Sequence, residues 1–509
     1  MRKIFTGEYI ARLDKYTIDY DNITSIELIE RAAIAFTTRF RLYYDTKRAI
    51  KIFSGSGKNG ADSLAVAILL NQLHYSVEVF FFNAGNSISE EAEFKLNELR
   101  TNDNIPLQEI GRGSSFNPPK IRSTDIIIDG IFGTGLNRPV EGAFASLIQF
   151  INHSHLTSGC DVISIDIPSG LYCDKNANIP QGAIIEATRT FTFEFPKLAF
   201  FFEENAKYTG RVETLSLSLN EEGKKLLPTD YYETTDFDIA DLLKQRPLFA
   251  HKGFFGHALL VGGSKGKIGA AILAAKGALR SGVGKLTCFV PECAELPLCT
   301  ALPEAMQIVD PHSEYLSIDP PLHPFHAVGV GPGLGTNEAT AKMLHHLLLR
   351  AECPIVLDAD AINIIAEAGL SSELPEKTIL TPHAKELERL VGVCTSSEQR
   401  LEEARTYAMR FNVIIILKGA YTAICSPSGQ IIFNPVANPA LATPGSGDVL
   451  TGMITSFLAQ KYPPLSAAIL ACYFHGMAGN IYSGKWDEYS MLASDIAELL
   501  PEAFKSFHR

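Results

Sequence analysis

The sequence has few of the features that mark secreted, membrane or nucleic-acid-binding proteins. Its nine cysteines are scattered, without a CxxC pair or a zinc signature, which favours a reducing, cytoplasmic compartment over a disulfide framework. No apolar run approaches the length of a membrane span, and no apolar segment follows Arg2 and Lys3 as it would in a signal peptide. Basic residues do not cluster and the net charge is −12, so neither nucleic acid nor a membrane is expected as a partner.

The length and the hydrophobic pattern indicate two α/β domains. A chain of 509 residues is too long for one ordinary core. Both halves alternate short apolar runs with longer amphipathic stretches, which is typical of parallel sheets covered by helices on both faces. A polar stretch with prolines lies between residues 217 and 252. We therefore expect one domain over residues 1–225 and a second over residues 226–509.

The apolar runs give the expected strands. In the first half they are 49–53, 77–82, 125–129, 162–166 and 190–195, with helices over 62–73 and 90–99. In the second half they are 258–262, 286–290, 327–330, 355–358, 379–381, 413–417, 423–425 and 431–434.

The most informative segment of the chain is 438–448, which ends in Gly445-Ser446-Gly447-Asp448 before an apolar run. This pattern predicts a glycine turn that opens a helix, where free backbone N–H groups and the helix dipole favour an anion. An acid beside an anion site is suited to take a proton from a hydroxyl that receives a phosphoryl group. The alternative is that Asp448 is only a helix N-cap.

Three loops of the first half follow predicted strands, over 54–62, 129–139 and 166–171. Because the carboxyl ends of parallel strands share one edge of a sheet, these loops are expected to converge. Asp129 and Asp166 each end an apolar run and precede a glycine loop, which favours a binding site over two unrelated turns. The first loop alone is a weak signal, since it matches neither GxGxxG nor a Walker A sequence.

Together these loops resemble the NAD(P)H-hydrate epimerase family, whose pattern is GxGNNGGDG, DxxFGTG and DxPSGL in this order. The resemblance covers most of residues 1–220, including Pro196-Lys197 and Glu30-Arg31-Ala32-Ala33. It implies a Rossmann-like three-layer domain, with Asp166 as the catalytic acid/base. The residues implied to contact the hydrated nucleotide are Lys58, Asn59, Gly60, Ala61, Asp62, Gly133, Thr134, Gly135, Leu136, Asn137, Arg138, Pro139 and Asp166.

The same resemblance implies a potassium site formed by Asn59, Asp129 and Ser169. Potassium takes oxygen ligands, and an amide, a carboxylate and a hydroxyl would supply them. The loop departs from the family pattern at Lys58, where Asn is usual, and at Ala61 and Ser63, where glycines are usual. These changes are expected to narrow the loop and to place a charge near the cation.

The second half carries a further ordered set of motifs: HKG..GH from His251, GGS from Gly262, GPGLG from Gly331, LDADA.N from Leu357, TPH from Thr381, KG..T from Lys418 and NP.LAT.GSGD from Asn438. Asp358 and Asp360 suit either Mg²⁺ or ribose contacts, or simple helix caps. A lone histidine such as His383 is more often structural than functional.

This set resembles the NAD(P)H-hydrate dehydratase family of the ribokinase-like superfamily, over about residues 245–505. The resemblance implies a ribokinase-like three-layer domain with Asp448 as the catalytic base. It implies contact with the hydrate from Ala271, Gly333, His383 and Asp448. The residues implied to bind the adenine nucleotide are Lys418, Gly419, Ala420, Tyr421, Thr422, Asn438, Pro439, Ala440, Leu441, Ala442, Thr443, Pro444, Gly445, Ser446 and Gly447. Phe254 and Ala384-Lys385 depart from the usual pattern.

The two resemblances imply one pathway of repair. The first domain would interconvert the epimers of NADHX and NADPHX, and the second would dehydrate one epimer with Mg²⁺ and with ADP as the expected donor, ATP not being excluded. A small-molecule kinase fused to a non-catalytic nucleotide-binding or interaction module is the alternative. A symmetric homo-oligomer is the default expectation. The sequence does not distinguish NADHX from NADPHX as the preferred substrate.

Overall fold

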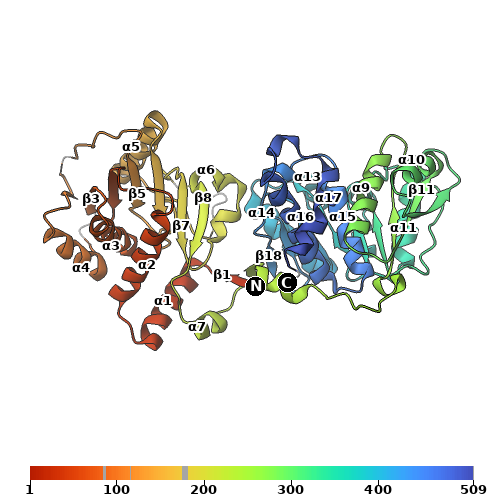
Figure 1. Cartoon of the computed structure of the whole chain (residues 1–509), viewed down its shortest axis with the longest axis horizontal. Helices are drawn as coiled ribbons and strands as arrows, with labels where there is room; N and C mark the ends of the chain where they lie inside the picture. The colour runs from red at the N-terminus through yellow and green to blue at the C-terminus, as the bar shows by residue number, and fades with distance from the viewer. Residues whose placement is uncertain (84–86, 115, 175–181, 508–509) are drawn as a thin grey trace. The chain divides into compact units, whose positions relative to one another are not determined.

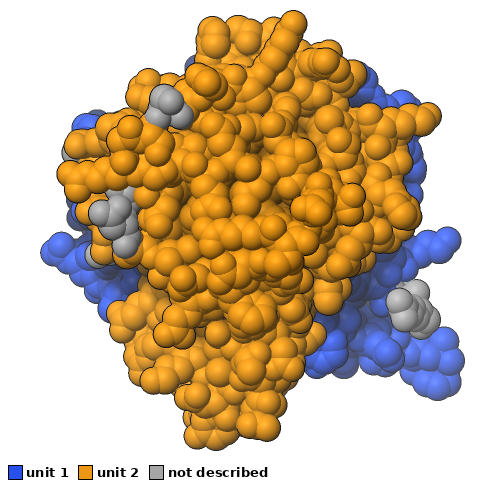
Figure 2. Space-filling model, turned by 90° about the vertical axis from the view of Figure 1, so that its left-hand side faces the viewer, with its two compact units in different colours: residues 1–2, 230–395, 399–509 blue, residues 3–229, 396–398 orange. Residues whose placement is uncertain are grey.

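The computed structural model describes residues 1–83, 87–114, 116–174 and 182–507. The chain forms two compact units (Figure 2). The N-terminal unit consists of Lys3–Thr229 and Ser396–Glu398, and the C-terminal unit of Met1–Arg2, Asp230–Thr395 and Gln399–Arg509. None of the helices in the described part of the chain is long and apolar enough to cross a membrane.

The N-terminal unit is built on a seven-stranded sheet in the order β4-β3-β2-β5-β6-β7-β8, whose neighbouring strands run parallel. The strands are β2 (Ile50–Ser54), β3 (Val77–Asn83), β4 (Leu107–Gly111), β5 (Ile126–Gly130), β6 (Asp161–Ile165), β7 (Arg189–Phe193) and β8 (Arg211–Leu215). The strand order reverses between β2 and β5. The carboxyl ends of these two strands therefore flank the point where open parallel sheets bind their ligands.

Helices cover both faces of this sheet (Figure 1). They are α1 (Gly7–Asp21), α2 (Ser25–Phe40), α3 (Lys58–Gln72), α4 (Glu90–Arg100), α5 (Gly142–Ser158), α6 (Ala206–Thr209) and α7 (Glu221–Leu226). Along β5, Ile126 and Ile128 join the core under α2, α3 and α4, whereas Ile127 joins the core under α5. This alternation is why an uninterrupted apolar strand marks a sheet buried on both sides.

The C-terminal sheet has eleven strands in the order β1-β9-β18-β17-β16-β15-β14-β13-β10-β11-β12. The strands are β1 (Arg2–Ile4), β9 (Tyr231–Glu233), β10 (His257–Val261), β11 (Lys285–Pro291), β12 (Met306–Asp310), β13 (Ala327–Val330), β14 (Ile355–Leu357), β15 (Ile379–Leu380), β16 (Ile414–Leu417), β17 (Ala423–Cys425) and β18 (Ile431–Phe433). The expectation of a parallel sheet is right for β10 to β16, but β17 is antiparallel to both of its neighbours.

The helices of this unit are α8 (Asp236–Leu242), α9 (Ile268–Arg280), α10 (Glu295–Ala301), α11 (Glu338–Arg350), α12 (Asp360–Ala368), α13 (Ala384–Val391), α14 (Ser397–Phe411), α15 (Ser446–Ala459), α16 (Pro464–Ser483) and α17 (Ala493–Lys505). Helices α9 and α15 pack backbone against backbone. A Cβ on Gly452 would lie 1.8 Å from the Ala274 carbonyl oxygen, so only glycine permits this approach. The contact fixes the middle of α15 against α9.

The predicted α/β fold class with two three-layer domains is confirmed, and each predicted strand is present with ends shifted by no more than one or two residues. The strands that the sequence did not predict lie mainly at sheet edges. Strands β4, β8 and β12 are half-exposed and mixed in polarity, so they lack the apolar run by which the buried strands were found. The predicted start of the helix over 62–73 is wrong. This helix is α3, and it begins at Lys58, which places Lys58 and Asn59 in its first turn.

Candidate functional site

The glycine turn before α15 has the predicted local structure. Gly445 precedes the helix with a φ of 90°, a conformation that favours glycine. A Cβ there would also lie 2.4 Å from Leu273 Cδ1. Ser446, Gly447 and Asp448 form the first turn of α15, where backbone N–H groups have no partner inside the helix. The turn is therefore a concentrated source of hydrogen-bond donors.

A lysine from a distant strand reaches this turn. Lys418 follows β16, and its Nζ lies 3.2 Å from the position that a Cβ on Gly447 would take. The ammonium is held by Asp358, whose Oδ1 is 2.8 Å away, while Thr451 donates to the other oxygen of Asp358 at 2.7 Å. A positive charge and free N–H groups thus meet at one point, which suits a phosphate.

Asp448 stands beside this point with an altered affinity for protons. Burial raises the pKa of its carboxyl to about 7, and the nearby Asp358 raises it further while Lys418 opposes the shift. A carboxylate with a pKa close to neutrality can accept a proton efficiently at physiological pH. The arrangement is therefore that of a general base next to an anion site.

A cavity of about 750 Å³ opens at the same turn. Of the predicted nucleotide-binding residues, those that line it are Lys418, Gly419, Ala420, Thr422, Asn438, Pro439, Leu441, Ala442, Thr443, Ser446 and Gly447. Those that do not line it are Tyr421, Ala440, Pro444 and Gly445. The segments 418–422 and 438–447 are distant in sequence, and most of their residues line the same cavity.

Other residues line this cavity that sequence reasoning missed: Asn434, Val436, Ala437, Leu450, Cys472, His475 and Gly476. His475 is buried, and its Nε2 lies 3.1 Å from the hydroxyl and 3.0 Å from the carbonyl oxygen of Ser446. Burial lowers its pKa to about 4, so the ring is neutral and buttresses the glycine turn. Helix α16 is buried on nearly every side, so no polar pattern in the sequence distinguishes its histidine.

The residues expected to contact the hydrate occupy different surroundings. Ala271 is buried in α9. The carbonyl oxygen of Gly333 accepts a hydrogen bond from Ser264 at 2.8 Å. His383 lines the cavity, but its Nδ1 also accepts from the backbone of Lys385 and Glu386 and caps α13. The structural role foreseen for this histidine is therefore present beside its place at the cavity.

In the N-terminal unit, Asp166 is tightly held at the end of β6. Its φ is 65°, a left-handed conformation that is uncommon for a residue other than glycine. Its Oδ1 accepts from Lys197 Nζ at 2.7 Å, from the Phe193 N–H at 3.0 Å and from Thr192 at 3.2 Å. Lys197 is fully buried and also donates to two backbone carbonyls. These contacts engage Oδ1 and leave Oδ2 of Asp166 without such a partner among the described residues.

Two further carboxyl groups interact with Asp166. Asp62, on α3, has a pKa well above its ordinary value because of burial and, next, the charge of Asp166. For Asp14, on α1, the same two causes raise the pKa to about 6. Sequence reasoning missed Asp14, because it lies in an amphipathic helix without a motif. Asp14 and Asp62 therefore hold their protons more strongly than ordinary carboxyls, and both interact with the ion-paired Asp166.

The three residues expected to hold potassium come together around the Phe132 backbone. Asn59 donates to the Phe132 carbonyl oxygen at 2.9 Å, and the Phe132 N–H donates to Ser169 Oγ at 2.8 Å. Ser169 in turn donates to Asp129 at 2.5 Å. Asp129 is fully buried, and no ion pair involves it in the described part of the chain. Asp129 accepts from the hydroxyls of Ser164 and Ser169 and from the N–H groups of Ser169 and Ile131, so both of its oxygens are hydrogen-bonded. The oxygens of Asn59, Asp129 and Ser169 are of the kind that a monovalent cation takes as ligands.

The residues at the departures from the epimerase pattern lie in the first turns of α3. Ala61 and Ser63 are buried in α3, and Ser63 donates to Ser54 at 2.7 Å and to the Gly60 carbonyl oxygen at 2.8 Å. The Lys58 side chain is 66% exposed, with its Nζ 3.6 Å from Glu91. It therefore turns outward instead of entering the group around Phe132.

The loop 133–139 approaches the same place at one end only. A Cβ on Gly133 would lie 3.0 Å from Asn59 Cβ, so this end meets the first turn of α3. Gly135, Asn137 and Arg138 are exposed to solvent. No group of three or more histidine, cysteine, aspartate or glutamate side chains in the described residues is placed to hold a metal.

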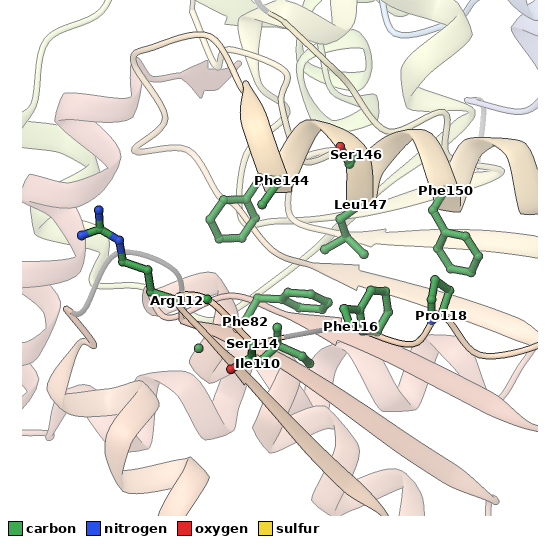
Figure 3. A pocket seen from close by; sticks show the side chains of 13 residues that line it. Phe82, Ile110, Arg112, Ser114, Phe116, Pro118, Phe144, Ser146, Leu147 and Phe150 are labelled. Carbon is green, nitrogen blue, oxygen red and sulfur yellow. The ribbon is translucent and has the colours of Figure 1, made fainter.

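A second cavity, of about 390 Å³, lies elsewhere in the N-terminal unit (Figure 3). It is lined mainly by aromatic and aliphatic side chains of β3, α5 and the segment after β4, including Phe82, Phe116, Phe144 and Phe150. None of the predicted site residues lines it.

Comparison with known proteins follows the same division of the chain. Residues 258–502 match the family described as NAD(P)H-hydrate dehydratase, and residues 25–199 match the family described as YjeF-related protein N-terminus. Over 99% of its length the chain is 33% identical to the bifunctional NAD(P)H-hydrate repair enzyme of Moorella thermoacetica, covering 97% of that protein. The chain belongs to the family of bifunctional NAD(P)H-hydrate repair enzymes. The resemblance of each half to one activity of this family is confirmed.

Other members of the repair-enzyme family align over nearly the whole chain. The enzyme of Salinibacter ruber is 31% identical over 98% of this chain and 95% of its own length. That of Escherichia coli is 29% identical over 98% of this chain and 93% of its own length. Among solved structures, the ADP/ATP-dependent NAD(P)H-hydrate dehydratase of Bacillus subtilis, co-crystallized with ATP/Mg²⁺, is 33% identical. It covers 54% of this chain and 97% of its own, with a TM-score of 0.47.

Proposed function

We propose that this chain restores hydrated NADH and NADPH through two sites. Residues 1–225 would interconvert the (R) and (S) epimers of NAD(P)HX. Residues 226–509 would dehydrate the (S) epimer, converting ADP to AMP and phosphate. The observation that supports this most is the meeting of Lys418, the glycine turn and Asp448 at the start of α15.

In the proposed dehydration, Asp448 accepts the proton of the substrate hydroxyl as that oxygen attacks the terminal phosphoryl group of ADP, and AMP leaves. The N–H groups of the turn and Lys418 stabilise the charge that develops on the transferred group. The phosphorylated carbon then loses phosphate with the electrons of its C–O bond. Loss of a proton from the adjacent carbon restores the ring double bond. Hydroxide is a poor leaving group, which is why phosphorylation comes first.

The cavity supports the nucleotide assignment. Lys418, Gly447 and Ser446 supply the phosphate end, while Val436, Leu441 and Leu450 supply apolar walls suited to a base. Mg²⁺ would neutralise nucleotide phosphate charge. Asp358 is engaged by Lys418 and Thr451, so we assign it to positioning Lys418. Ala271, Gly333 and His383 remain proposed contacts of the hydrate.

In the proposed epimerisation, the hydroxyl leaves the carbon next to the ring nitrogen as water, and water then adds to the other face. A protonated carboxyl such as Asp62 would supply the proton to the leaving hydroxyl. Asp166, paired with Lys197, would accept the proton from the incoming water. Residues 58–62 and 133–139 would bind the nucleotide, and K⁺ held by Asn59, Asp129 and Ser169 would fix the loops to one another.

The test is recovery of dihydronicotinamide near-UV absorbance from a mixed-epimer NADH hydrate with Mg²⁺ and either ADP or ATP. Complete recovery with one nucleotide is expected and would name the donor. Recovery that stops at the share of one epimer would refute the epimerase assignment. Formation of a stable phosphorylated product would instead favour a small-molecule kinase.

A further inference from the structure

Lys267 forms an ion pair beside the proposed base of the C-terminal site. Burial and the charges of Asp358 and Asp360 raise the pKa of Asp448, so both carboxylates act on the base. Each of them holds a lysine: Lys418 Nζ is 2.8 Å from Asp358 Oδ1, and Lys267 Nζ is 3.0 Å from Asp360 Oδ2. Lys418 is assigned to the nucleotide phosphates, whereas Lys267 has no part in the dehydration as proposed above.

The two lysines reach these acids from opposite sides. Asp358 and Asp360 follow β14, while Lys418 follows β16 and Lys267 belongs to the loop after β10. In the sheet, β14 lies between β16 and β10. Ala359, between the two acids, has a φ of 48°, which is uncommon for a residue other than glycine. This turn separates the carboxylates, so each of them pairs with a different lysine.

Lys267 also lies beside residues that are proposed to contact the hydrate. A Cβ on Gly333 would lie 3.0 Å from Lys267 Cβ and 2.3 Å from the Lys267 carbonyl oxygen. Ala271 is four residues further along, and side chains at this spacing lie one above the other on a helix. The Gly335 N–H donates at 2.8 Å to the same oxygen of Asp360 that holds Lys267. The loop at Gly333, the start of α9 and Asp360 therefore meet at this lysine.

The Lys267 ammonium is open to a ligand. Its side chain is 54% exposed, and an ammonium carries three N–H donors, one of which is donated to Asp360. Lys265, in the same loop, pairs instead with Glu314, which follows β12 at the edge of the sheet. Of these two exposed lysines, Lys267 is the one that stands next to the proposed hydrate contacts.

Two polyanions would occupy this site together during the proposed dehydration. ADP brings its phosphates to Lys418 and the glycine turn, and the hydrate of NADH brings a pyrophosphate of its own. The carboxylates of Asp358, Asp360 and Asp448 would repel that pyrophosphate. A lysine that neutralises one of these acids and keeps two donors free offsets the repulsion and can bind a phosphate oxygen.

We propose that Lys267 binds the pyrophosphate of the hydrate and makes the C-terminal site selective for hydrates that carry phosphate. This inference rests on the proposed dehydration at that site and adds a group that recognises a part of the substrate remote from the ring. A phosphate oxygen accepts from Nζ while the pair with Asp360 persists. A hydrated nucleoside offers no such acceptor, so the same site binds it more weakly.

The test compares two hydrates in nucleotide-dependent dehydration by the full chain: NADHX and hydrated dihydronicotinamide riboside, which has no phosphate. The reaction is run at pH 9, well above the pKa of about 7 of Asp448, so that the base is ionised in each variant. In the unmodified chain, KM should be about tenfold lower for NADHX than for the riboside hydrate. In Lys267→Met, KM for NADHX should rise about tenfold with little change in kcat, and KM for the riboside hydrate should stay the same.

Two further variants separate a phosphate contact from other effects. Lys267→Arg keeps the charge and should keep KM for NADHX near that of the unmodified chain. Lys265→Met removes a neighbouring lysine that pairs elsewhere, and it should leave both KM values unchanged.

Equal KM values of the unmodified chain for the two hydrates would overturn the proposal without the use of any variant. An unchanged KM for NADHX in Lys267→Met would also overturn it, as would an equal rise for both hydrates, which would indicate a structural role. An equal rise in Lys265→Met would assign the effect to the general charge of the loop and would count against the proposal. Failure of the unmodified chain to dehydrate either hydrate would instead refute the proposed function itself.

Discussion

Replacing Asp448 with Asn should abolish dehydration and at the same time stabilise the C-terminal unit at neutral pH. The carboxyl has a pKa of about 7 in the folded chain, against an ordinary value of 3.8. A raised pKa means that folding disfavours the charged form. Below pH 3.8 the carboxyl is protonated in both states and has no effect on the free energy of unfolding. As the pH rises it destabilises the folded state, and the destabilisation is complete above pH 7. Asn is neutral and similar in shape, so it removes this cost.

The size of the effect follows from the shift. The pKa rises from 3.8 to about 7 on folding, which corresponds to a loss of about 4 kcal/mol in the free energy of unfolding at any pH above both pKa values. Because the side chain keeps some contact with solvent, we expect a gain of about 2 to 4 kcal/mol at pH 8. At pH 5.5 the gain should be about 1 to 2 kcal/mol, and at pH 3.5 it should vanish.

The chain offers a built-in probe for this measurement. Its one tryptophan, Trp486, lies in the C-terminal unit and packs on Tyr482 with ring centroids 5.1 Å apart. Urea unfolding followed by Trp486 fluorescence at the three pH values gives the free energy of unfolding of this unit. Dehydration and ADP binding are measured on the same samples, and ADP binding should largely persist.

Asp310→Asn is the matched control with the opposite sign. Burial of Asp310 opposes its charge, but backbone N–H groups of His312, Ile318 and Ser317 outweigh burial and lower its pKa. Asn there should destabilise the unit above about pH 4. If Asp448→Asn loses stability at pH 8, or gains equally at all pH values, the electrostatic account of Asp448 is wrong. If it also loses ADP binding to the same degree as dehydration, the assignment as base is wrong.

Four further outcomes are expected. Lys418→Met should lower dehydration about 100-fold or more, because it removes the cation beside the glycine turn, while epimer exchange is unchanged. Lys197→Met should lower epimer exchange by a similar factor, because Asp166 loses its buried cation, while dehydration is unchanged. The pH profile of epimer exchange should show a step near pH 6, where Asp14 titrates, and Asp14→Asn should remove that step. Replacing K⁺ with a large organic cation should slow epimer exchange alone, because the cation that we propose at Asn59, Asp129 and Ser169 would be lost.

Epimer exchange and dehydration are measured separately in each variant, so each activity serves as the control for the other. Loss of both activities in Lys197→Met or Lys418→Met would indicate misfolding, and circular dichroism would show it. Arg at position 197 should not rescue exchange, since the lysine is fully buried. An unchanged pH step in Asp14→Asn would remove Asp14 from the site. Exchange that is independent of K⁺ would contradict the cation assignment.

Much of the fold could be predicted because each buried strand is visible in the sequence as a short apolar run. Strands such as β5 and β16 are apolar runs flanked by helical patterns, and their order along the chain implies parallel pairing. Edge strands such as β8 and β12 do not form an apolar run, because part of each strand is exposed to solvent and carries polar residues. The strand β17 was predicted, but its antiparallel direction could not be, because the hydrophobic pattern of a short buried strand is the same in either direction.

By itself the sequence determined the two sets of strand-end loops, the glycine turn at Gly445 and the identity of Asp448 as its acid. These features depend on neighbours within a few residues. Only the tertiary structure decided that Lys418 stands over Gly447, that His475 supports Ser446, and that Asp14 interacts with Asp166. The partners in these contacts come from elements far apart in the chain. Sheet order and helix packing bring these elements together, and a local pattern of polar and apolar residues does not predict which distant elements will meet.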